Sequence, residues 1–242
     1  MRSNPIVAHR GWSGIAPENT MAAFRLAAGD GRIGWIELDV QLSSDGVPVV
    51  IHDFTLERTT KASGRVRDYT YEQLARLDNG SWFSPEFGNE RIPALEQVLI
   101  EMKGRVKLNI ELKTAVKLYP GLEQAMLELL RRHDWLDDVV ITSFDPYALQ
   151  LVRVLEPHVR TGLIVSGSPM MLLGQLRFAG AGFLSISYRH LNRQLVHELM
   201  DQSGIDVMAW TVNEAEAIRR MMDLHPGLMI CTNYPDRALA YS

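Results

Sequence analysis

The sequence predicts an α/β protein with the TIM (β/α)₈ barrel fold, and two observations support that fold class. Short runs of β-branched and apolar residues recur along the chain, and segments with helical periodicity lie between most of them. Alternating strands and helices require a parallel sheet. The chain has 242 residues, close to the length of about 250 that is typical of one barrel, whereas an open doubly wound sheet usually has fewer units.

Nine segments have the composition of strands: Ile6–His9, Trp35–Val40, Val47–His52, Val106–Leu112, Val139–Ser143, Arg160–Val165, Phe183–Ser187, Asp206–Thr211 and Leu228–Thr232. Helical periodicity marks the intervening segments Thr20–Ala28, Leu122–His133, Tyr147–Leu155, Arg193–Gln202 and Glu214–Leu224. A barrel of this class has eight strands, so one of the nine candidates must lie outside the parallel series.

The extra strand is Val47–His52. Only six residues separate it from Trp35–Val40, too few for a crossover helix. They end in Asp45-Gly46, a dipeptide typical of tight hairpin turns. The sequence therefore predicts that Val47–His52 folds back antiparallel to the second strand.

The hairpin also predicts which side chains meet. If Asp45 and Gly46 are the two turn residues, Ser44 faces Val47 and Asp39 lies opposite His52. Glu37 lies two residues before Asp39 and therefore on the same strand face. We expect these three ionisable groups, Glu37, Asp39 and His52, to converge.

The segment after this hairpin differs in character. Residues 54–93 are rich in Gly, Ser and aromatic residues, with one short helical patch at Tyr71–Leu77. Because the segment leaves from the end of the hairpin, we predict a small insertion that lies over the C-terminal face of the barrel. Residues 1–242 are otherwise expected to form a single domain, since no internal repeat or low-complexity tract interrupts them.

Composition excludes several classes of function. The chain has 25 Lys and Arg against 29 Asp and Glu, a formal net charge of −4, so no basic field favours nucleic acid. The single cysteine, Cys231, excludes an internal disulfide and a CxxC metal site. No segment approaches the roughly 20 apolar residues of a membrane span. We therefore expect a cytoplasmic protein without stable membrane insertion, and the oligomeric state stays open.

Catalytic groups of TIM barrels lie at the C-terminal strand ends. Those ends are polar here, and they carry His9, Arg10, Glu37, Asp39, Glu111, Lys113, Ser143, Asp145, Trp210, Asn213, Thr232 and Asn233. Three carboxylates that point inward, Glu37, Asp39 and Glu111, could not all ionise in one barrel mouth without a neutralising cation. Oxygen ligands favour Mg²⁺ or Ca²⁺ over zinc.

His9 and His52 differ from the other five histidines because each ends an apolar β run and precedes a charged residue. Either one alone could be a core histidine whose ring is satisfied by its neighbours. Together, flanking a carboxylate cluster, they indicate a general acid and base pair. Arg10 and Lys113 add two cations, which beside a metal indicate an anionic substrate, with phosphate favoured by the fork of the guanidinium.

Seven short motifs, in this order, resemble the bacterial glycerophosphodiester phosphodiesterases, a family of phospholipase-C-like TIM barrels. They are Val7-Ala8-His9-Arg10-Gly11, Ala16-Pro17-Glu18-Asn19-Thr20, Glu37-Leu38-Asp39-Val40, His52-Asp53, Glu111-Leu112-Lys113, Ser143-Phe144 and Trp210-Thr211-Val212-Asn213. The match runs from about residue 5 to residue 236. One departure is Asn233, since the family usually has Asp after this threonine.

The resemblance implies hydrolysis of glycerophosphodiesters to sn-glycerol 3-phosphate and an alcohol, with a divalent cation. Glu37, Asp39 and Glu111 match metal ligands. His9 and His52 match the acid and base pair, with His9 as the base and His52 as the acid. Whether water or the glycerol 2-hydroxyl attacks the phosphorus stays open.

Five further positions are expected to bind substrate. Arg10 and Lys113 match the family's phosphate contacts. Glu18 is expected to reach Arg10 or a water in the site, although its motif could also be no more than a helix start. Trp210 and Phe144, at strand ends, could bind substrate or simply plug the barrel top.

Three rival functions use the same fold. A relative that cleaves lysophospholipids in the manner of a lysophospholipase D would show a long apolar groove at the mouth, and the aromatic-rich insertion leaves this open. The apolar run at residues 169–173 is better interpreted as part of an outer helix than as a lid or a membrane contact. A barrel that binds phosphodiesters without cleaving them would lack a catalytic group. A sugar-phosphate isomerase or aldolase would need a Schiff-base lysine or metal-binding histidines.

Overall fold

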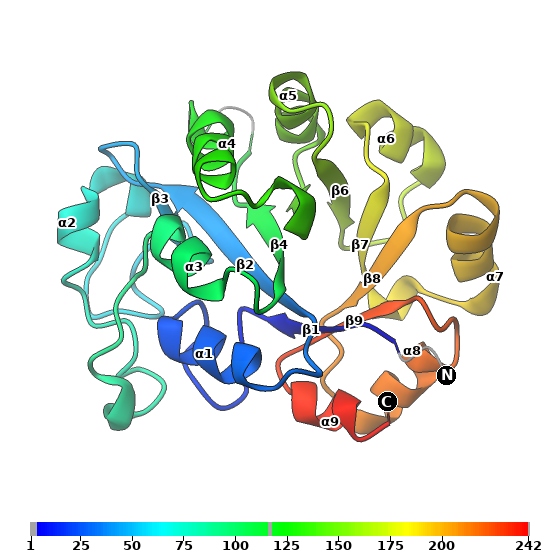
Figure 1. The fold of residues 1–242 in the computed structure, drawn as a ribbon, viewed down its shortest axis with the longest axis horizontal. Coiled ribbons are helices and arrows are strands. Elements are labelled where there is room, and N and C mark those ends of the chain that lie inside the picture. Colours follow the sequence, from blue (N-terminus) through cyan, green and yellow to red (C-terminus); the bar gives the residue numbers. More distant parts are fainter. Residues whose placement is uncertain (1–3, 116–117, 242) are drawn as a thin grey trace.

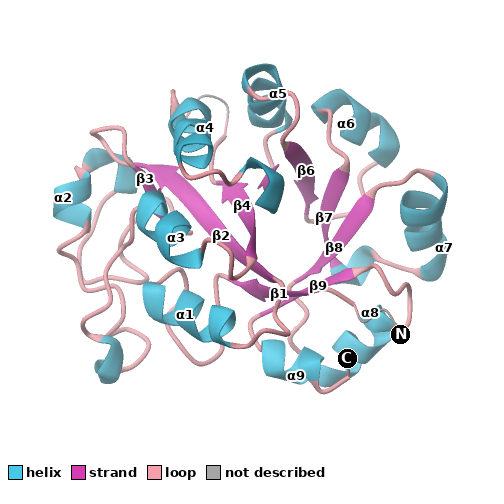
Figure 2. Ribbon diagram, viewed as in Figure 1, coloured by secondary structure: helices cyan, strands magenta, loops and turns pink. Residues whose placement is uncertain are grey.

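In residues 4–115 and 118–241, which the computed structural model describes, eight parallel strands close into a barrel (Figures 1 and 2). The strands of the barrel are β1 (Ile6–His9), β2 (Trp35–Leu42), β4 (Lys107–Leu112), β5 (Val139–Ser143), β6 (Arg160–Val165), β7 (Phe183–Ser187), β8 (Asp206–Trp210) and β9 (Met229–Thr232). Pairing of β1 with both β9 and β2 completes the ring. The predicted fold class is confirmed.

Helices surround this ring and cover the outer face of the strands (Figure 2). They are α1 (Met21–Gly29), α3 (Leu95–Met102), α4 (Leu122–Arg132), α5 (Pro146–Leu155), α6 (Leu172–Ala179), α7 (Arg193–Val196, continued by a π-helical turn His197–Gln202), α8 (Ala215–Met222) and α9 (Pro235–Leu239). The five helices predicted from periodicity are present. The sequence analysis missed α3 and α9.

The hairpin strand β3 (Pro48–Val50) is antiparallel to β2, as predicted, but the predicted register is wrong by one residue. Ser43 N donates to Val47 O at 3.0 Å, and Gly46, at φ 79°, closes a three-residue loop. The Ser43 side chain favours this longer loop because its Oγ accepts from Val47 N at 2.9 Å.

Asp39 consequently pairs with Ile51, whose N–H donates to Asp39 O at 3.0 Å, and not with His52. His52 still reaches the barrel mouth because the ladder ends at Val50 and the chain turns. Gln41 holds this turn: its Nε2 donates to the carbonyl oxygens of residues 51, 52 and 53 at 2.9, 3.1 and 2.7 Å.

The apolar core has three parts. The largest lies between the strands and the surrounding helices. A second fills the inside of the barrel below the site and consists of Val7, Val140, Phe183, Met208, Met229 and Cys231. A third supports the insertion and consists of Val49, Ile51, Leu56, Val66, Leu74 and Ile92.

Residues 54–93 lie beside β3, at the left of Figure 1, and include α2 (Tyr71–Leu74) and two short 3₁₀ turns, Val66–Asp68 and Pro85–Phe87. The segment touches the barrel mouth through Arg58, which contacts Glu18 and Asp53. That the whole segment covers the C-terminal face stays a prediction.

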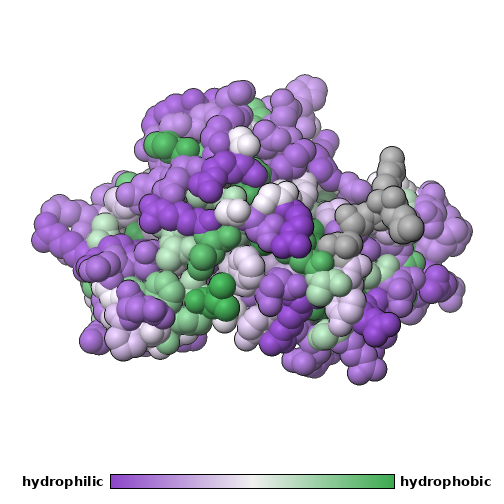
Figure 3. All heavy atoms as spheres, turned by 60° about the horizontal axis from the view of Figure 1, so that its bottom comes forward, coloured by the Kyte–Doolittle hydropathy of each residue, from purple (hydrophilic) through white to green (hydrophobic). Residues whose placement is uncertain are grey.

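Among the described residues, no helix has the length and apolar character needed to cross a membrane. On the face shown in Figure 3, hydrophilic residues predominate and a smaller apolar area lies between them. Scattered apolar surface of this kind is ordinary in folded proteins.

Gly11 fixes the loop that follows β1. Its φ is +79°, and a Cβ atom placed there would lie 2.7 Å from the backbone carbon of Ala23 in α1. Trp12 N also donates to Ala23 O at 3.0 Å. The loop that carries Arg10 therefore lies directly against α1, and only glycine fits the contact.

Gly11→Ala is expected to lower the free energy of unfolding more than Gly104→Ala, its matched control. Gly104 has a similar φ of +73° with no atom within 4 Å, so alanine there costs only the left-handed backbone strain, about 1–2 kcal/mol. The clash at Gly11 should add about 1–3 kcal/mol. Urea denaturation measures both, and equal losses would contradict the close contact with α1.

Candidate active site

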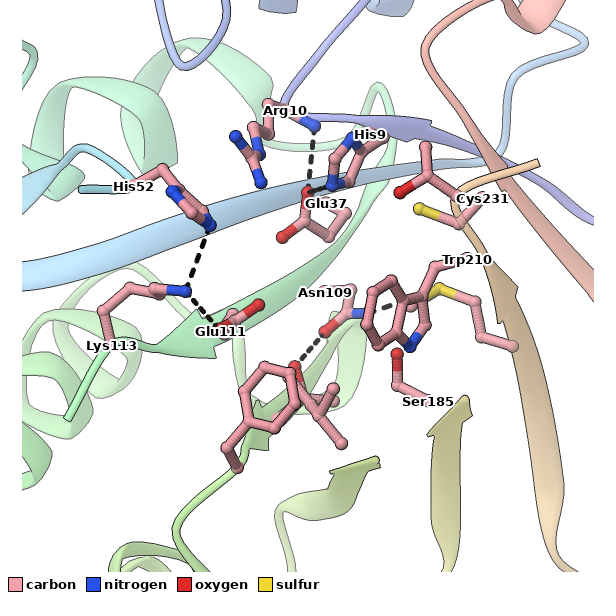
Figure 4. Close-up of a pocket in the computed structure, with 15 residues that line it drawn as sticks. His9, Arg10, Glu37, His52, Asn109, Glu111, Lys113, Ser185, Trp210 and Cys231 are labelled. Atoms are coloured by element: carbon pink, nitrogen blue, oxygen red, sulfur yellow. Dashed lines mark hydrogen bonds and ion pairs between the residues drawn. The ribbon is translucent and has the colours of Figure 1, made fainter. Parts of the chain in front are cut away.

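The predicted site residues gather at the C-terminal ends of the strands, around one pocket (Figure 4). His9 and His52 lie on opposite sides of Arg10 and Glu37. The residues that line the pocket are His9, Arg10, Glu37, His52, Asn109, Glu111, Lys113, Thr142, Phe144, Ile164, Ser185, Met208, Trp210, Thr211 and Cys231. Of the predicted residues, Asp39 and Glu18 lie just outside this lining and contact it.

Three carboxylates form the centre of the site. Glu37 and Asp39 come from β2 and Glu111 from β4, and one oxygen of each lies within 4.8 Å of the others. Alternation along β2 turns positions 37 and 39 inward, while Leu38 packs into the outer core. The register between the strands places Asp39 beside Glu111. The three carboxylates that were expected to point inward therefore do meet in one barrel mouth.

Two cations partly neutralise the carboxylates. The backbone N–H of Arg10 donates to Glu37 Oε2 at 2.9 Å, and Arg10 Nε lies 3.3 Å from Asp39 Oδ2. Lys113 Nζ donates to Glu111 Oε1 at 2.8 Å and lies 3.9 Å from Asp39 Oδ1. Arg10 and Lys113 thus each contact two members of the cluster.

The three carboxylates share their charge unequally. Burial and the charge of Asp39 raise the pKa of Glu111 to about 7 and that of Glu37 well above its usual range. Burial also acts against ionisation of Asp39, but the positive charges of Arg10, His52 and Lys113 outweigh it and lower the pKa of Asp39. Asp39 is therefore the most firmly ionised member of the cluster.

The cluster has the chemistry of a site for a hard divalent cation. Asp39 Oδ1 is buried and has no hydrogen-bond partner, which is uncommon for a buried carboxylate oxygen. A bound cation would satisfy this oxygen. The other oxygen of Asp39 accepts from Asn19 Nδ2 at 2.8 Å, which fixes the orientation of the carboxylate. All the candidate metal ligands are carboxylate oxygens, the type of ligand that Mg²⁺ and Ca²⁺ prefer. The residues present fit the predicted metal.

His9, at the end of β1, is held by the end of β9. Its Nδ1 lies 2.7 Å from Asn233 Oδ1, an atom that can only accept, so Nδ1 carries the proton and Nε2 is left as the acceptor. Nε2 lies 3.8 Å from Glu37 Oε2. Burial, with the nearby positive charge of Arg10, lowers the pKa of His9 to about 4.

His52 is held in a similar way on the opposite side. Its Nδ1 lies 2.6 Å from Asp53 Oδ1, and its Nε2 lies 3.2 Å from Lys113 Nζ. Burial lowers the pKa of His52, while the charges of Asp39 and Asp53 oppose that effect. Both histidines therefore have Nδ1 fixed by an acceptor and Nε2 on the side of the pocket.

Aromatic and neutral polar groups form the rest of the pocket. Trp210 and Phe144 stack edge to face with ring centroids 6.2 Å apart, and the buried Trp210 Nε1 has no hydrogen-bond partner. Deeper in the barrel, Thr142 Oγ1 donates to Asn109 Oδ1 at 2.7 Å. Ser185 also lines the pocket.

The sequence analysis missed several residues that support the site. Gln41 continues the inward face of β2 after positions 37 and 39, so period-two counting could have found it. Asn19 lies in a loop and binds Asp39. Asn213, which the sequence analysis placed at a strand end, has an Oδ1 that accepts from Asn233 N at 2.9 Å. The expected contact of Glu18 with Arg10 is present, because Arg10 Nη1 donates to Glu18 at 2.8 Å. Glu18 also binds Arg58, a residue that no sequence pattern indicated.

A TIM barrel with three carboxylates, two histidines and two cations at its C-terminal mouth has the fold and site of a phosphodiesterase. Comparison with known proteins agrees. The model of the glycerophosphoryl diester phosphodiesterase family matches residues 9–237, so this chain belongs to that family. The resemblance found in the sequence is thereby confirmed.

Individual relatives match over nearly the whole chain. A glycerophosphodiester phosphodiesterase of Caldanaerobacter subterraneus subsp. tengcongensis is 39% identical over 219 residues, 90% of this chain and 89% of that protein. One of Bacillus altitudinis is 38% identical over 239 residues, 97% of this chain and 96% of that protein. The structure of an Oleispira antarctica phosphodiesterase in complex with the product sn-glycerol-3-phosphate has a TM-score of 0.91 at 33% identity and covers 98% of this chain and 96% of its own.

Asn233→Asp should raise the pKa of His9. A carboxylate in place of the amide oxygen 2.7 Å from Nδ1 would stabilise the imidazolium, so the pKa should move from about 4 toward its usual value of 6.5. An NMR titration of the histidine ring signals measures the shift. Asn192→Asp, at the start of α7, is the control, and an unchanged His9 pKa in Asn233→Asp would contradict the contact.

Proposed function

We propose that this protein hydrolyses glycerophosphodiesters to sn-glycerol 3-phosphate and an alcohol, with His9 and His52 as general base and acid and with a divalent cation at Glu37, Asp39 and Glu111. One observation carries the proposal: two histidines with fixed rings lie on opposite sides of a carboxylate cluster. The names of the relatives, and the glycerol phosphate product in the Oleispira structure, support the choice of substrate.

The hydrogen-bond acceptors at Nδ1 of His9 and His52 support the assignment of His9 as base and His52 as acid. Asn233 gives His9 a neutral acceptor, and with a pKa lowered to about 4 the ring is uncharged near neutral pH, as a base must be. Asp53 gives His52 a charged acceptor, which favours the protonated ring and opposes the lowering of the His52 pKa by burial and by the charges of Arg10 and Lys113. His9 thus takes the proton of the attacking oxygen, and His52 donates one to the departing alkoxide.

Phosphate binding falls to Arg10 and Lys113. Both line the pocket, and both are partly occupied by carboxylates in the absence of another cation. A bound divalent cation would neutralise Glu37, Asp39 and Glu111 and stabilise negative charge that develops on the phosphoryl oxygens. Arg10 and Lys113 would then have donors left for those oxygens. Trp210 Nε1, buried without a partner, is suited to donate to a substrate oxygen.

An apolar hollow next to the pocket favours lipid-bearing diesters as a second candidate substrate class. Phe144 and Ile164 line both the pocket and this hollow. The hollow continues to Met170, Met171 and Phe178, all exposed. A hydrocarbon chain attached to a bound phosphodiester could lie along these side chains, so a lysophospholipid is the relevant comparison substrate.

Addition of Mg²⁺ or Ca²⁺ should raise the melting temperature, and more at about pH 8 than at about pH 5. The pKa of Glu111 is raised in the folded protein, to about 7, so its contribution to stability is present below the unfolded pKa and is lost as pH rises through 7. A cation bound to the folded state reverses that loss. Glu111→Gln should weaken both effects, and a melting temperature independent of cation at both pH values would contradict the metal site.

His9→Ala and His52→Ala should each lower kcat for glycerophosphocholine by roughly 100-fold or more, since acid and base steps are worth about 10²–10⁴-fold. Release of sn-glycerol 3-phosphate measures turnover, with glycerophosphoethanolamine and lysophosphatidylcholine as parallel substrates. His197→Ala is the control, because that ring is exposed and binds Asp201 far from the pocket.

A diester with a nitrophenol leaving group needs no protonation and should restore turnover to His52→Ala but not to His9→Ala. If the nitrophenyl diester restores turnover to His9→Ala and not to His52→Ala, His9 is the acid and His52 is the base. Wild-type protein that releases no glycerol phosphate from any of the three natural substrates, with Mg²⁺ or Ca²⁺ present, would contradict the proposed function.

A further inference from the structure

Arg58, in the insertion, binds two carboxylates at the edge of the site. Its Nε and Nη2 donate to Asp53 Oδ2 and Oδ1 at 2.5 and 3.1 Å, and its Nη1 and Nη2 donate to Glu18 Oε2 and Oε1 at 2.9 and 2.7 Å. The planar guanidinium thus holds both carboxylates in fixed positions, which an ammonium could not do.

The side chain of Arg58 is 42% exposed, and ion pairs with that exposure contribute little to stability. Stability therefore gives little reason for this geometry. Arg58 is not among the residues that line the pocket either. Its contacts do lead to the pocket, through Asp53 on one side and through Glu18 on the other.

The path through Asp53 ends at His52. Asp53 Oδ1 lies 2.6 Å from His52 Nδ1, and this contact sets which ring nitrogen faces the site. The Asp53 side chain is 30% exposed and follows the end of β3, where the ladder no longer holds the chain. Burial acts against its ionisation, but hydrogen bonds from Arg58 and His52 lower the pKa of Asp53 to about 2.

Glu18, the second carboxylate that Arg58 binds, is itself held in place by Arg10. Glu18 also accepts from Arg10 Nη1 at 2.8 Å, and its carboxylate is only 14% exposed. On the insertion side, the Trp82 ring lies 6.0 Å from Arg58 Cζ. Arg58 is therefore fixed from two directions and can transmit that fixed position to Asp53.

We propose that Arg58 is a positioning residue for the reaction: it holds Asp53 so that the His52 ring keeps Nε2 directed into the pocket. The inference rests on the role of His52 in the proposed function. It also gives the insertion a part in catalysis, because a residue of that segment, outside the pocket lining, determines how the His52 ring is oriented.

A double-mutant cycle with His52→Ala tests the proposal. Arg58→Gln should lower kcat for glycerophosphocholine by about 10–100-fold, the usual effect of removing a group that orients a reacting one, with KM changed less than about twofold. In the His52→Ala background the same substitution should change kcat by less than about twofold, because the ring through which it acts is gone. The kcat of Arg58→Lys should lie between those of Arg58→Gln and the wild type, because an ammonium keeps the charge but lacks the planar pair of donors of the guanidinium.

Arg65→Gln is the matched control. Arg65 lies in the same insertion and makes an ion pair of the same kind, but with Asp68, at 2.9 Å, and not with the carboxylates at the mouth that Arg58 binds. The kcat of Arg65→Gln should equal that of the wild type. If Arg58→Gln does not fold, Asp53→Asn replaces it, since that variant leaves Arg58 and Glu18 paired and should show the same lack of additivity with His52→Ala.

Wild-type kcat in a folded Arg58→Gln, with His52→Ala impaired, would overturn the inference and leave the proposed function standing. An equal loss from Arg58→Gln in both backgrounds would also overturn it, because Arg58 would then act through Glu18 and Arg10. Wild-type kcat in His52→Ala would instead remove the proposed role of His52, and the inference with it.

Discussion

Three carboxylates in one buried barrel mouth are the constraint on which the rest of the site depends. Each lies within 4.8 Å of the others, and like charges so close together in a buried site cannot all ionise unaided. Arg10 and Lys113 each contact two of them. Arg10, the residue after β1, has a left-handed backbone at φ 58°, and its N–H donates to Glu37. The backbone after β1 and the Arg10 side chain thus both contact the cluster.

His9 and His52 lie on opposite sides of the carboxylate cluster. Each is fixed at Nδ1 by an acceptor from a different part of the chain, Asn233 after β9 and Asp53 after β3. The acceptors differ in charge, since Asn233 offers a neutral amide oxygen and Asp53 a carboxylate, while burial lowers the pKa of both rings. Under the proposed function, this difference in charge distinguishes the base, His9, from the acid, His52.

Much of the site could be predicted from the sequence because period-two alternation is local. It places Glu37 and Asp39 on one face of β2, and parallel pairing brings Glu111 beside them. The hairpin register could not be predicted, since the Ser43 side chain selects a three-residue loop over the two-residue turn. Asn19 and Arg58 could not be assigned either, because they reach the site from loops whose paths depend on tertiary packing and not on periodicity. Gln41 is different: its position on the inward face was available from counting along β2.

The central claim, that a divalent cation completes the carboxylate cluster, is tested most directly by calorimetric titration of the metal-free protein with Mg²⁺ and Ca²⁺ near pH 7, in buffers of different ionisation enthalpy. Glu37 and Glu111 have raised pKa values in the metal-free protein, so a cation that binds there must displace protons. The expected result is one ion per chain with measurable proton release, both lost in Asp39→Asn. Absence of binding at millimolar cation, or binding without proton release that persists in Asp39→Asn, would contradict it.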